Sequence, residues 1–261
     1  MEKLLVIKIG GNVVDDEECL ATFLQDFASL PYAKILVHGG GVLATKMAAD
    51  LGISQDIIDG RRITDAATLK VVTMVYGGYV NKQIVSGLQA YNCNAAGFTG
   101  ADGNLITAHK RINASINYGF VGDVDAVNIE FLQMLLRHQI VPVIAPVTHD
   151  GKGQLLNTNA DTIAQEIALS LSKCFNTSLV YCFEKPGVLQ NVLDESSVIK
   201  KINRQSFVKL KEDGIIHSGM LPKLDNAFVA LQKGVNSVVI GKAKDIKLLI
   251  EKKAGTSVVH E

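Results

Sequence analysis

The sequence has few of the features that mark several large classes of protein. No run of apolar residues approaches 18, the length that a transmembrane helix needs, and the apolar run near the N-terminus is too short for a signal peptide. Lysine plus arginine and aspartate plus glutamate number 26 each, so the formal net charge of zero gives no sign of a surface for nucleic acid or for an anionic membrane. We therefore expect no nucleic-acid partner and no membrane partner.

Cysteine and histidine also lack the spacings that mark disulfide frameworks and metal sites. Only four cysteines occur in 261 residues, and none forms a C-x-x-C pair. A chain of this length does not need disulfides to fold, so we expect reduced thiols and a cytoplasmic location. The six histidines show no zinc-ligand spacing, and no G-x-x-x-x-G-K-[ST] segment predicts an ordinary P-loop.

The sequence does contain a regular alternation of strand-like and helix-like segments. Helical patterns, the longest over 65–91, alternate with apolar strand-like runs at 4–9, 33–41, 140–147, 178–184 and 236–241. This alternation predicts an α/β fold, a three-layer α/β/α sandwich whose mostly parallel central sheet is covered by helices on both faces. Residues 95–127 differ, because short alternating pieces rich in Gly, Asn and Asp predict hairpins or a flap.

The domain organisation follows from the lack of a linker. No internal repeat and no proline- or serine-rich segment divides the chain. A polar turn near residue 150 follows the strand at 140–147, which favours a subdivision between 150 and 175. We therefore expect two lobes that share one sheet, residues 1–165 and 166–261, and not two separate domains.

Glycine turns follow several of the predicted strands. Gly10 and Gly11 close the first strand, Gly39 to Gly41 close the second, and Gly187 follows a later one. In open α/β sheets ligands bind beyond these strand ends, and glycine lets backbone N–H groups approach an anion closely. One such turn is better explained as a tight connection, whereas two turns from the first two strands suit a phosphate or carboxylate site as well as they suit tight connections.

Three charged residues occupy positions that raise a question about their partners. Lys8 interrupts an apolar strand, so it either faces solvent on an edge strand or meets an anion in the interior. Lys223 lies in the first turn of a predicted helix, where the helix dipole disfavours a cation. It is either solvated or held there to receive a highly charged anion. Asp161 also begins a predicted helix, and it is either a first-turn acid or the group that holds two lysines apart.

Other polar residues suit the recognition of a small substrate. Arg61 and Arg62 precede the long predicted helix. A guanidinium binds a carboxylate through two parallel hydrogen bonds, although a surface charge pair explains these residues equally well. Asn157 and Asn159 lie just before Asp161 and suit either a turn or helix cap or an amide that reads a polar substrate.

One motif points to a different class of enzyme. The residues from Gly39 to Ala44 fit G-x-G-x-x-A, the dinucleotide-binding fingerprint. The acid that this fingerprint requires about 20 residues later would be Asp56 or Asp59. Both lie in a polar, turn-like stretch and not at the end of a strand, so we discount an NAD(P)-dependent oxidoreductase.

In this order and at this spacing, the motifs resemble those of the amino acid kinase family. The similar segments span nearly the whole chain, which makes the resemblance highly specific. They are VIKIGG at 6–11, VHGGG at 37–41, GRRITD at 60–65, NK at 81–82, GFVGDV at 119–124, LNTNAD at 156–161, PGVL at 186–189 and SGMLPKLDNA at 218–227.

The resemblance implies the amino acid kinase fold and a role for particular residues. Lys8 and Lys223 match the lysines that stabilise the transferring phosphoryl group, and Asp161 matches the aspartate that organises them. The N-terminal lobe would bind an acylated amino acid, at positions that match Gly40, Gly41, Arg62 and Asn157. The positions that match nucleotide contacts are Gly10, Gly11, Glu184, Lys185, Pro186, Gly187, Val188, Leu189, Ile215, Ile216 and His217.

The reaction implied is phosphoryl transfer from ATP, with Mg²⁺, to the side-chain carboxylate of an N-acylglutamate. A carboxylate with a reference pKa of about 4.3 is ionised at neutral pH, so the reaction needs no general base. The obstacle is charge repulsion, which two lysines, glycine-turn N–H groups, helix N-termini and Mg²⁺ would offset. Mg²⁺ would bind mainly through ATP oxygens.

The sequence leaves the acceptor partly open. Acetyl is the acyl group usual in the family, and a succinyl group would need only a roomier pocket. Other members act on aspartate, glutamate, an aminoadipate derivative, carbamate or UMP, although GRRITD together with LNTNAD favours an acylglutamate. A non-catalytic binding protein of the same fold is a further alternative, and the retention of Lys8, Asp161 and Lys223 argues against it.

The resemblance also implies a homodimer formed through the N-terminal lobe. The first strand begins by Leu4, which leaves no room for the additional N-terminal helix that links dimers of arginine-inhibited relatives into a hexamer. We therefore expect a homodimer insensitive to arginine. The nucleotide loop departs most from the family pattern, because Glu184 stands where relatives often carry Asp and the connector at 173–177 is a few residues longer.

Overall fold

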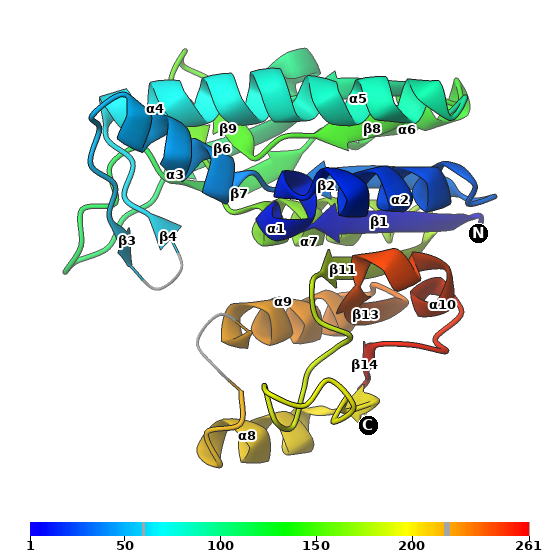
Figure 1. The fold of residues 1–261 in the computed structure, drawn as a ribbon. Coiled ribbons are helices and arrows are strands. Elements are labelled where there is room, and N and C mark those ends of the chain that lie inside the picture. The colour runs from blue at the N-terminus through cyan, green and yellow to red at the C-terminus, as the bar shows by residue number, and fades with distance from the viewer. Residues whose placement is uncertain (59–60, 217–219, 261) are drawn as a thin grey trace.

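The computed structural model describes residues 1–58, 61–216 and 220–260 (Figure 1). Its central element is an eight-stranded sheet with the strand order β12-β14-β13-β11-β1-β2-β8-β5. Every neighbouring pair from β13 to β5 is parallel, whereas β14 runs antiparallel to β13. The α/β class and the mostly parallel sheet expected from the sequence are confirmed.

The strands of this sheet are mostly buried and short. They are β1 (Lys3–Ile9), β2 (Ala33–His38), β5 (Ala95–Phe98), β8 (Val141–Ile144), β11 (Asn176–Phe183), β12 (Lys201–Ile202), β13 (Ser237–Lys242) and β14 (Thr256–Val258). Successive side chains of β1 enter opposite cores, since Leu5 and Ile7 belong to one buried cluster and Leu4 and Val6 to the other. β1 is therefore a central strand and not an edge strand.

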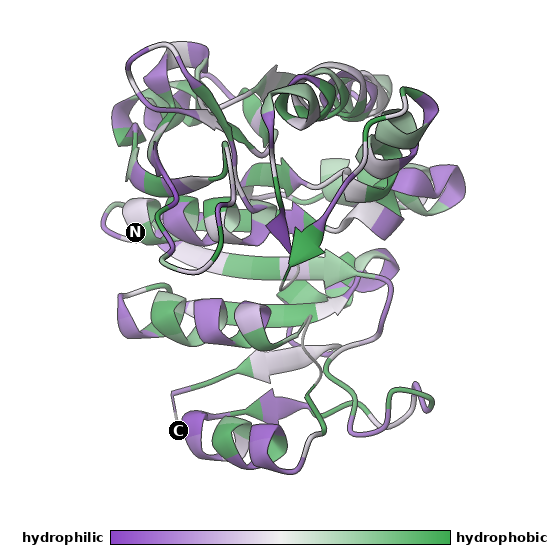
Figure 2. Cartoon of the chain, turned by 90° about the vertical axis from the view of Figure 1, so that its left-hand side faces the viewer, coloured by the Kyte–Doolittle hydropathy of each residue, from purple (hydrophilic) through white to green (hydrophobic). Residues whose placement is uncertain are grey.

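Helices cover both faces of the sheet and give the three expected layers. One face carries α1 (Gly11–Asp15), α2 (Glu17–Ala28), α3 (Gly41–Asp50), α4 (Ala66–Val72), α5 (Asn81–Ala90) and α10 (Ile246–Ile250). The other carries α6 (Ile129–Arg137), α7 (Ala160–Leu171), α8 (Arg204–Glu212) and α9 (Leu221–Gln232). Figure 2 shows apolar residues concentrated in the central strands, whereas the helices mix polar and apolar residues, as expected for elements with one buried side.

The long helix predicted over 65–91 is present with an irregular middle. Asp65 caps its start by accepting a hydrogen bond from the backbone N–H of Thr68, and α4 then continues through a π-helical segment at Thr73–Val80 into α5. The π-helical segment contains Gly77 and Gly78, the glycine pair of this helix. Among the described residues, no helix is both long and apolar enough to cross a membrane.

The prediction of hairpins over 95–127 is only partly right: β5, the first strand of this segment, is an edge strand of the central sheet, whereas the rest contributes to a second, smaller sheet. β6 (Ile106–Lys110) and β7 (Gly122–Val127) pair antiparallel, and β9 (Val147–His149) and β10 (Leu155–Asn157) complete a four-stranded sheet. A short antiparallel pair, β3 (Ile57–Ile58) and β4 (Arg61–Arg62), forms a separate two-stranded sheet at the left of Figure 1. β10 ends at Asn157, and the chain leads from there directly into α7, which begins at Ala160.

Candidate active site

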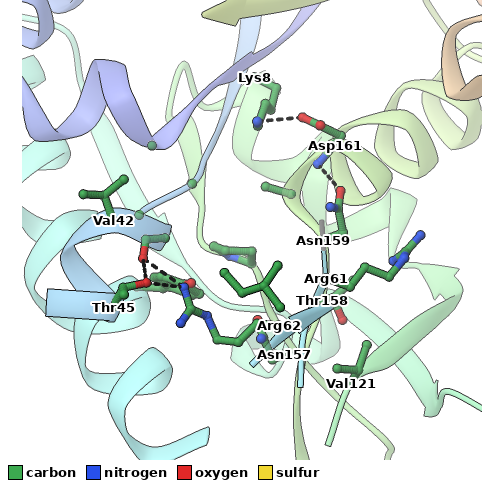
Figure 3. Close-up of a pocket in the computed structure, with 18 of the residues that line it drawn as sticks. Lys8, Val42, Thr45, Arg61, Arg62, Val121, Asn157, Thr158, Asn159 and Asp161 are labelled. Atoms are coloured by element: carbon green, nitrogen blue, oxygen red, sulfur yellow. Dashed lines mark hydrogen bonds and ion pairs between the residues drawn. The ribbon is translucent and has the colours of Figure 1, made fainter. Parts of the chain in front are cut away.

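An ion cluster lies at the carboxyl end of β1. The ammonium nitrogen of Lys8 lies 2.6 Å from Oδ1 of Asp161, and the ammonium of Lys223 donates to Oδ2 of the same carboxylate. Figure 3 shows the ion pair between Lys8 and Asp161. The structure thus brings together three residues that are widely separated in the sequence. Of the two alternatives for Lys8, the interior position with an anionic partner is the one observed.

Local structure explains how each member reaches the cluster. Lys8 shares the orientation of Leu4 and Val6 along β1, so its side chain faces the layer that contains α7. Asn159 caps α7 by accepting hydrogen bonds from the backbone N–H groups of Asp161 (2.9 Å) and of the next residue (3.1 Å), which fixes Asp161 in the first turn. Lys223 lies in the first turn of α9.

Burial and charge determine the electrostatics of the cluster. The side chains of Lys8 and Asp161 are each 10% exposed, and that of Lys223 is 20% exposed. Burial alone would raise the pKa of the Asp161 carboxyl, but the two ammonium groups outweigh burial and hold that pKa well below its usual range. Burial also lowers the pKa of Lys8, against the opposing effect of Asp161. With one carboxylate between two ammonium groups, the cluster has a surplus positive charge that suits an incoming anion.

Two glycine turns stand beside this cluster. Gly10 donates its backbone N–H to the carbonyl of Cys182 (3.0 Å), and Gly39 donates to the carbonyl of Ile9 (3.1 Å), so both turns are fixed to the ends of central strands. Gly40 has φ +154° and ψ 18°, a conformation that residues with a side chain rarely adopt. A Cβ there would also lie 3.0 Å from Cδ1 of Tyr76, so this turn requires glycine.

A cavity of about 380 Å³ extends from two members of the cluster, Lys8 and Asp161, to the residues expected to bind the acceptor, and Lys223 is not among its described lining residues. Its lining includes Lys8, Gly11, Gly40, Gly41, Arg62, Asn157 and Asp161. Arg62 donates through Nη2 to the carbonyl of Gly41 (2.9 Å) and to Oγ1 of Thr45 (2.8 Å), and Asn157 donates through Nδ2 to Oγ1 of Thr64 (3.0 Å). Figure 3 shows Lys8 and Arg62 on opposite sides of this cavity.

Of the expected nucleotide residues that the structure describes, Gly11 lines this cavity, whereas Gly10 and those of the later loops do not. Glu184 to Leu189 follow β11, and the loop is held by a hydrogen bond of 2.8 Å from the N–H of Val188 to Oγ1 of Thr256. Neither this loop nor Ile215 or Ile216 belongs to the described lining of the cavity. Ile216 packs in the hydrophobic core. His217 lies outside the described residues.

Sequence reasoning missed several residues that line the cavity. Thr45 follows the second glycine turn by one helical turn and holds Arg62, whereas Tyr76 lies in the π-helical segment and packs on Gly40. Thr158 and Ala160 also line the cavity, between Asn157 and Asp161. Only the position of Thr45, close to the glycine turn, offered a sequence signal. Within the described parts of the chain, no group of three His, Cys, Asp or Glu residues is arranged to hold a metal ion.

Comparison with known proteins agrees with this geometry. The model of the amino acid kinase family matches residues 3–242. This chain belongs to the amino acid kinase family. It is 53% identical over 262 residues to a protein of Cytophaga hutchinsonii named acetylglutamate kinase, with 99% of each chain covered. It is 56% identical over 246 residues to the acetylglutamate kinase of Parabacteroides distasonis, covering 94% of this chain and 96% of that protein.

A solved structure extends the family likeness to the fold. N-acetylglutamate synthase from Neisseria gonorrhoeae, in complex with coenzyme A and N-acetyl-glutamate, superposes with a TM-score of 0.84 at 21% identity. The match covers 100% of this chain and 60% of the synthase chain. At this identity the likeness shows that the two chains share the amino acid kinase fold.

Proposed function

We propose that this chain phosphorylates the side-chain carboxylate of N-acetyl-L-glutamate with ATP, the second step of arginine biosynthesis. A carboxylate oxygen of the acceptor attacks the γ-phosphorus, the bond to the β–γ bridging oxygen breaks, and the products are an acyl phosphate and ADP. The observation that carries the proposal is that Lys8 and Lys223 both bind Asp161 beside two glycine turns. The chain is also 53–56% identical to proteins named acetylglutamate kinase.

The acceptor would lie in the 380 Å³ cavity. Its side-chain carboxylate would approach Lys8 and the glycine turns, and Arg62 and Asn157 would bind its other polar groups across the cavity. The Arg62 guanidinium suits the α-carboxylate, because a guanidinium matches a carboxylate with two parallel N–H donors. Holding both ends of the acceptor fixes the attacking oxygen, and such alignment supplies much of the catalysis in phosphoryl transfer.

Lys8 and Lys223 would neutralise charge on the phosphoryl group as it moves between the two oxygens. Asp161 would not ligate the phosphate; it would keep the two ammonium groups oriented by binding one with each oxygen. Preorganised charges of this kind act without reorganising during the reaction, which makes them effective in a partly buried site. ATP would bind with Gly10, Gly11 and the loop that follows β11.

Mg²⁺ prefers oxygen ligands, and the described residues contain no group of three His, Cys, Asp or Glu side chains that could hold it. Both oxygens of Asp161 are engaged by lysines, and the described residues hold no cluster of carboxylates at the cavity. We propose that Mg²⁺ enters with ATP, bound to phosphate oxygens, where it would offset negative charge. No residue of the chain is assigned to it.

The proposal extends to organisation and assembly. Residues 1–165 would bind the acceptor and form a homodimer, and residues 166–261 would bind ATP. Met47, Met74 and Tyr79 on the helices beside the cavity are 40%, 58% and 62% exposed, and a dimer would bury such apolar surface. A cytoplasmic location fits the free cysteines of the described chain.

A panel of acceptors tests the proposal. ADP release is measured with N-acetyl-L-glutamate, N-succinyl-L-glutamate, L-glutamate, L-aspartate, carbamate and UMP, and the acyl phosphate is trapped with hydroxylamine. The highest kcat/KM with N-acetyl-L-glutamate and a stoichiometric hydroxamate are expected. A higher kcat/KM with any other acceptor would contradict the assigned substrate, and no turnover with any of them would contradict the kinase activity.

A further inference from the structure

A buried chain of hydrogen bonds leads to the glycine turn after β2. The ammonium of Lys82 donates to Oδ1 of Asn81 (3.1 Å), and the amide nitrogen of Asn81 lies 3.1 Å from Nε2 of His38. Nδ1 of His38 lies 2.7 Å from the carbonyl oxygen of Gly39. His38 is fully buried and Asn81 is 1% exposed, so water does not compete for the contacts of the imidazole, whereas Lys82 at the outer end is exposed.

The partners at each end determine which atom carries each proton. An ammonium group only donates, so the Asn81 atom that meets Lys82 is the carbonyl oxygen, and the NH₂ group faces both His38 and the carbonyl of Val143 (3.0 Å). Nε2 of His38 must then accept, so Nδ1 carries the proton and donates to Gly39. Burial lowers the pKa of His38 to about 4, which agrees with a neutral ring at pH 7.

This donation fixes the peptide that joins Gly39 to Gly40. In a trans peptide the C=O and the N–H point in opposite directions, so holding the Gly39 carbonyl at the buried ring turns the Gly40 N–H away from it. Within residues 1–58, 61–216 and 220–260, the Gly40 N–H donates to no other group of the chain. Gly39, Gly40 and Lys8 all line the 380 Å³ cavity.

We propose that His38 is a positioning residue for phosphoryl transfer: through its Nδ1–H it holds the Gly39–Gly40 peptide so that the Gly40 N–H faces the reacting anions. Asn81 fixes the tautomer, and Lys82 fixes the amide of Asn81. Glycine alone at position 40 leaves the peptide free to rotate, so a neighbouring group is needed to set its direction. This inference rests on the proposed function: measuring kcat requires the phosphoryl transfer proposed above, whereas the tautomer of His38 can be determined without it.

Two substitutions separate the proposed role from a structural one. The NH₂ group of His38→Asn lies near the place of Nδ1 and donates to Gly39, but this side chain does not reach Asn81. The amide oxygen of His38→Gln lies near the place of Nε2 and accepts from Asn81, but this side chain has no donor near Gly39. Each loses one buried hydrogen bond, so similar falls in Tm are expected. We expect kcat to fall at least about tenfold in His38→Gln, with the KM for ATP nearly unchanged, and to stay within about threefold of the wild type in His38→Asn.

The result that overturns the proposal is equal kcat in the two variants, whether both are slow or both are normal, because a structural role would follow Tm alone. A second measurement needs no turnover. Long-range ¹H–¹⁵N correlation spectra of the wild-type imidazoles should show His38 as the Nδ1–H tautomer at pH 7, and an Nε2–H tautomer or a charged ring would overturn the proposal. If the wild type does not phosphorylate N-acetyl-L-glutamate, the proposed function fails while this spectrum still tests the hydrogen-bond chain.

Discussion

Lys8 and Lys223, from opposite ends of the chain, bind the two oxygens of one buried carboxylate, that of Asp161. Two ammonium groups that bind the same carboxylate lie close enough to repel each other, and a single carboxylate offsets only part of that repulsion. The arrangement therefore favours a further anion beside the pair. A phosphoryl group that moves between an acceptor carboxylate and ADP supplies such an anion.

Replacing Asp161 tests how the pair is held. In Asp161→Asn the carboxylate charge is lost and two partly buried ammonium groups face each other, so we expect unfolding free energy to fall by about 3–5 kcal/mol at pH 7. The measurement is urea denaturation of both proteins, and a stability equal to that of the wild type would contradict the assigned ion cluster.

The same variant has a defined pH dependence. The folded pKa of Asp161 lies below its unfolded value, so its contribution to stability is fully present above about pH 4 to 5 and is lost as pH falls toward the folded pKa. The stability difference between wild type and Asp161→Asn should therefore stay constant between pH 6 and 7 and shrink below about pH 4. A difference that grows in acid would have the wrong sign for this cluster.

Arg62 is expected to determine acceptor affinity. Removing a guanidinium that binds a carboxylate costs a charged hydrogen bond, so Arg62→Ala should raise the KM for N-acetyl-L-glutamate about 10- to 100-fold while the KM for ATP stays unchanged. Arg62→Lys should restore little of this, because an ammonium lacks the paired donors. Arg137→Ala on the exposed end of α6 is the matched control. An unchanged acceptor KM in Arg62→Ala would mean that the carboxylate is held elsewhere.

Gly40 and Gly52 form a matched pair for the glycine turn. Both have positive φ, +154° and +70°, but a Cβ on Gly40 would lie 3.0 Å from Tyr76, whereas one on Gly52 meets nothing within 4 Å. Backbone strain should lower the stability of both alanine variants by about 1–3 kcal/mol. Only Gly40→Ala should also lose kcat, since only that turn borders the cavity. Equal kcat values in Gly40→Ala and Gly52→Ala would show that the glycine turn at Gly40 does not contribute to catalysis.

The loop after β11 offers a test of nucleotide binding. Thr256 is fully buried, and its Oγ1 accepts from the N–H of Val188, so Thr256→Val leaves that donor unpaired at a cost of about 1–3 kcal/mol. The looser loop should raise the KM for ATP severalfold without changing the acceptor KM. Thr177→Val, at the opposite end of β11, removes a buried hydroxyl far from this loop and should change neither KM. If the KM for ATP were unchanged in Thr256→Val, the loop after β11 would not bind the nucleotide.

The sequence was most informative where a residue conflicts with its local setting. Lys8 in an apolar strand and Lys223 in a first helical turn leave a choice between solvent and an anion partner, and alternating β and α segments predict the sheet. Period-two alternation also gives the orientation of Lys8, because its position shares the face of Leu4 and Val6.

Other parts of the site depend on tertiary contacts that no local pattern displays. Tyr76 lies in a π-helical segment, and ordinary helical periodicity does not indicate that its ring packs on Gly40. The sequence indicates only that His38 ends a strand followed by glycines. Its tautomer depends on Asn81, which lies on a different element. The second sheet, which brings Asn157 to the cavity, is likewise formed by segments far apart in sequence.

The most direct test of the account is the rate of phosphoryl transfer in Lys8→Ala and Lys223→Ala at saturating ATP and N-acetyl-L-glutamate. Each should transfer about 10²- to 10³-fold more slowly than the wild type, because each loses a preorganised positive charge, with much smaller changes in either KM. Lys34→Met is the control: Lys34 is also buried, but its ammonium binds the carbonyls of Ala28 and Leu30 at the other end of the sheet, and the variant should keep its rate. Near-normal rates in both lysine variants would contradict the account.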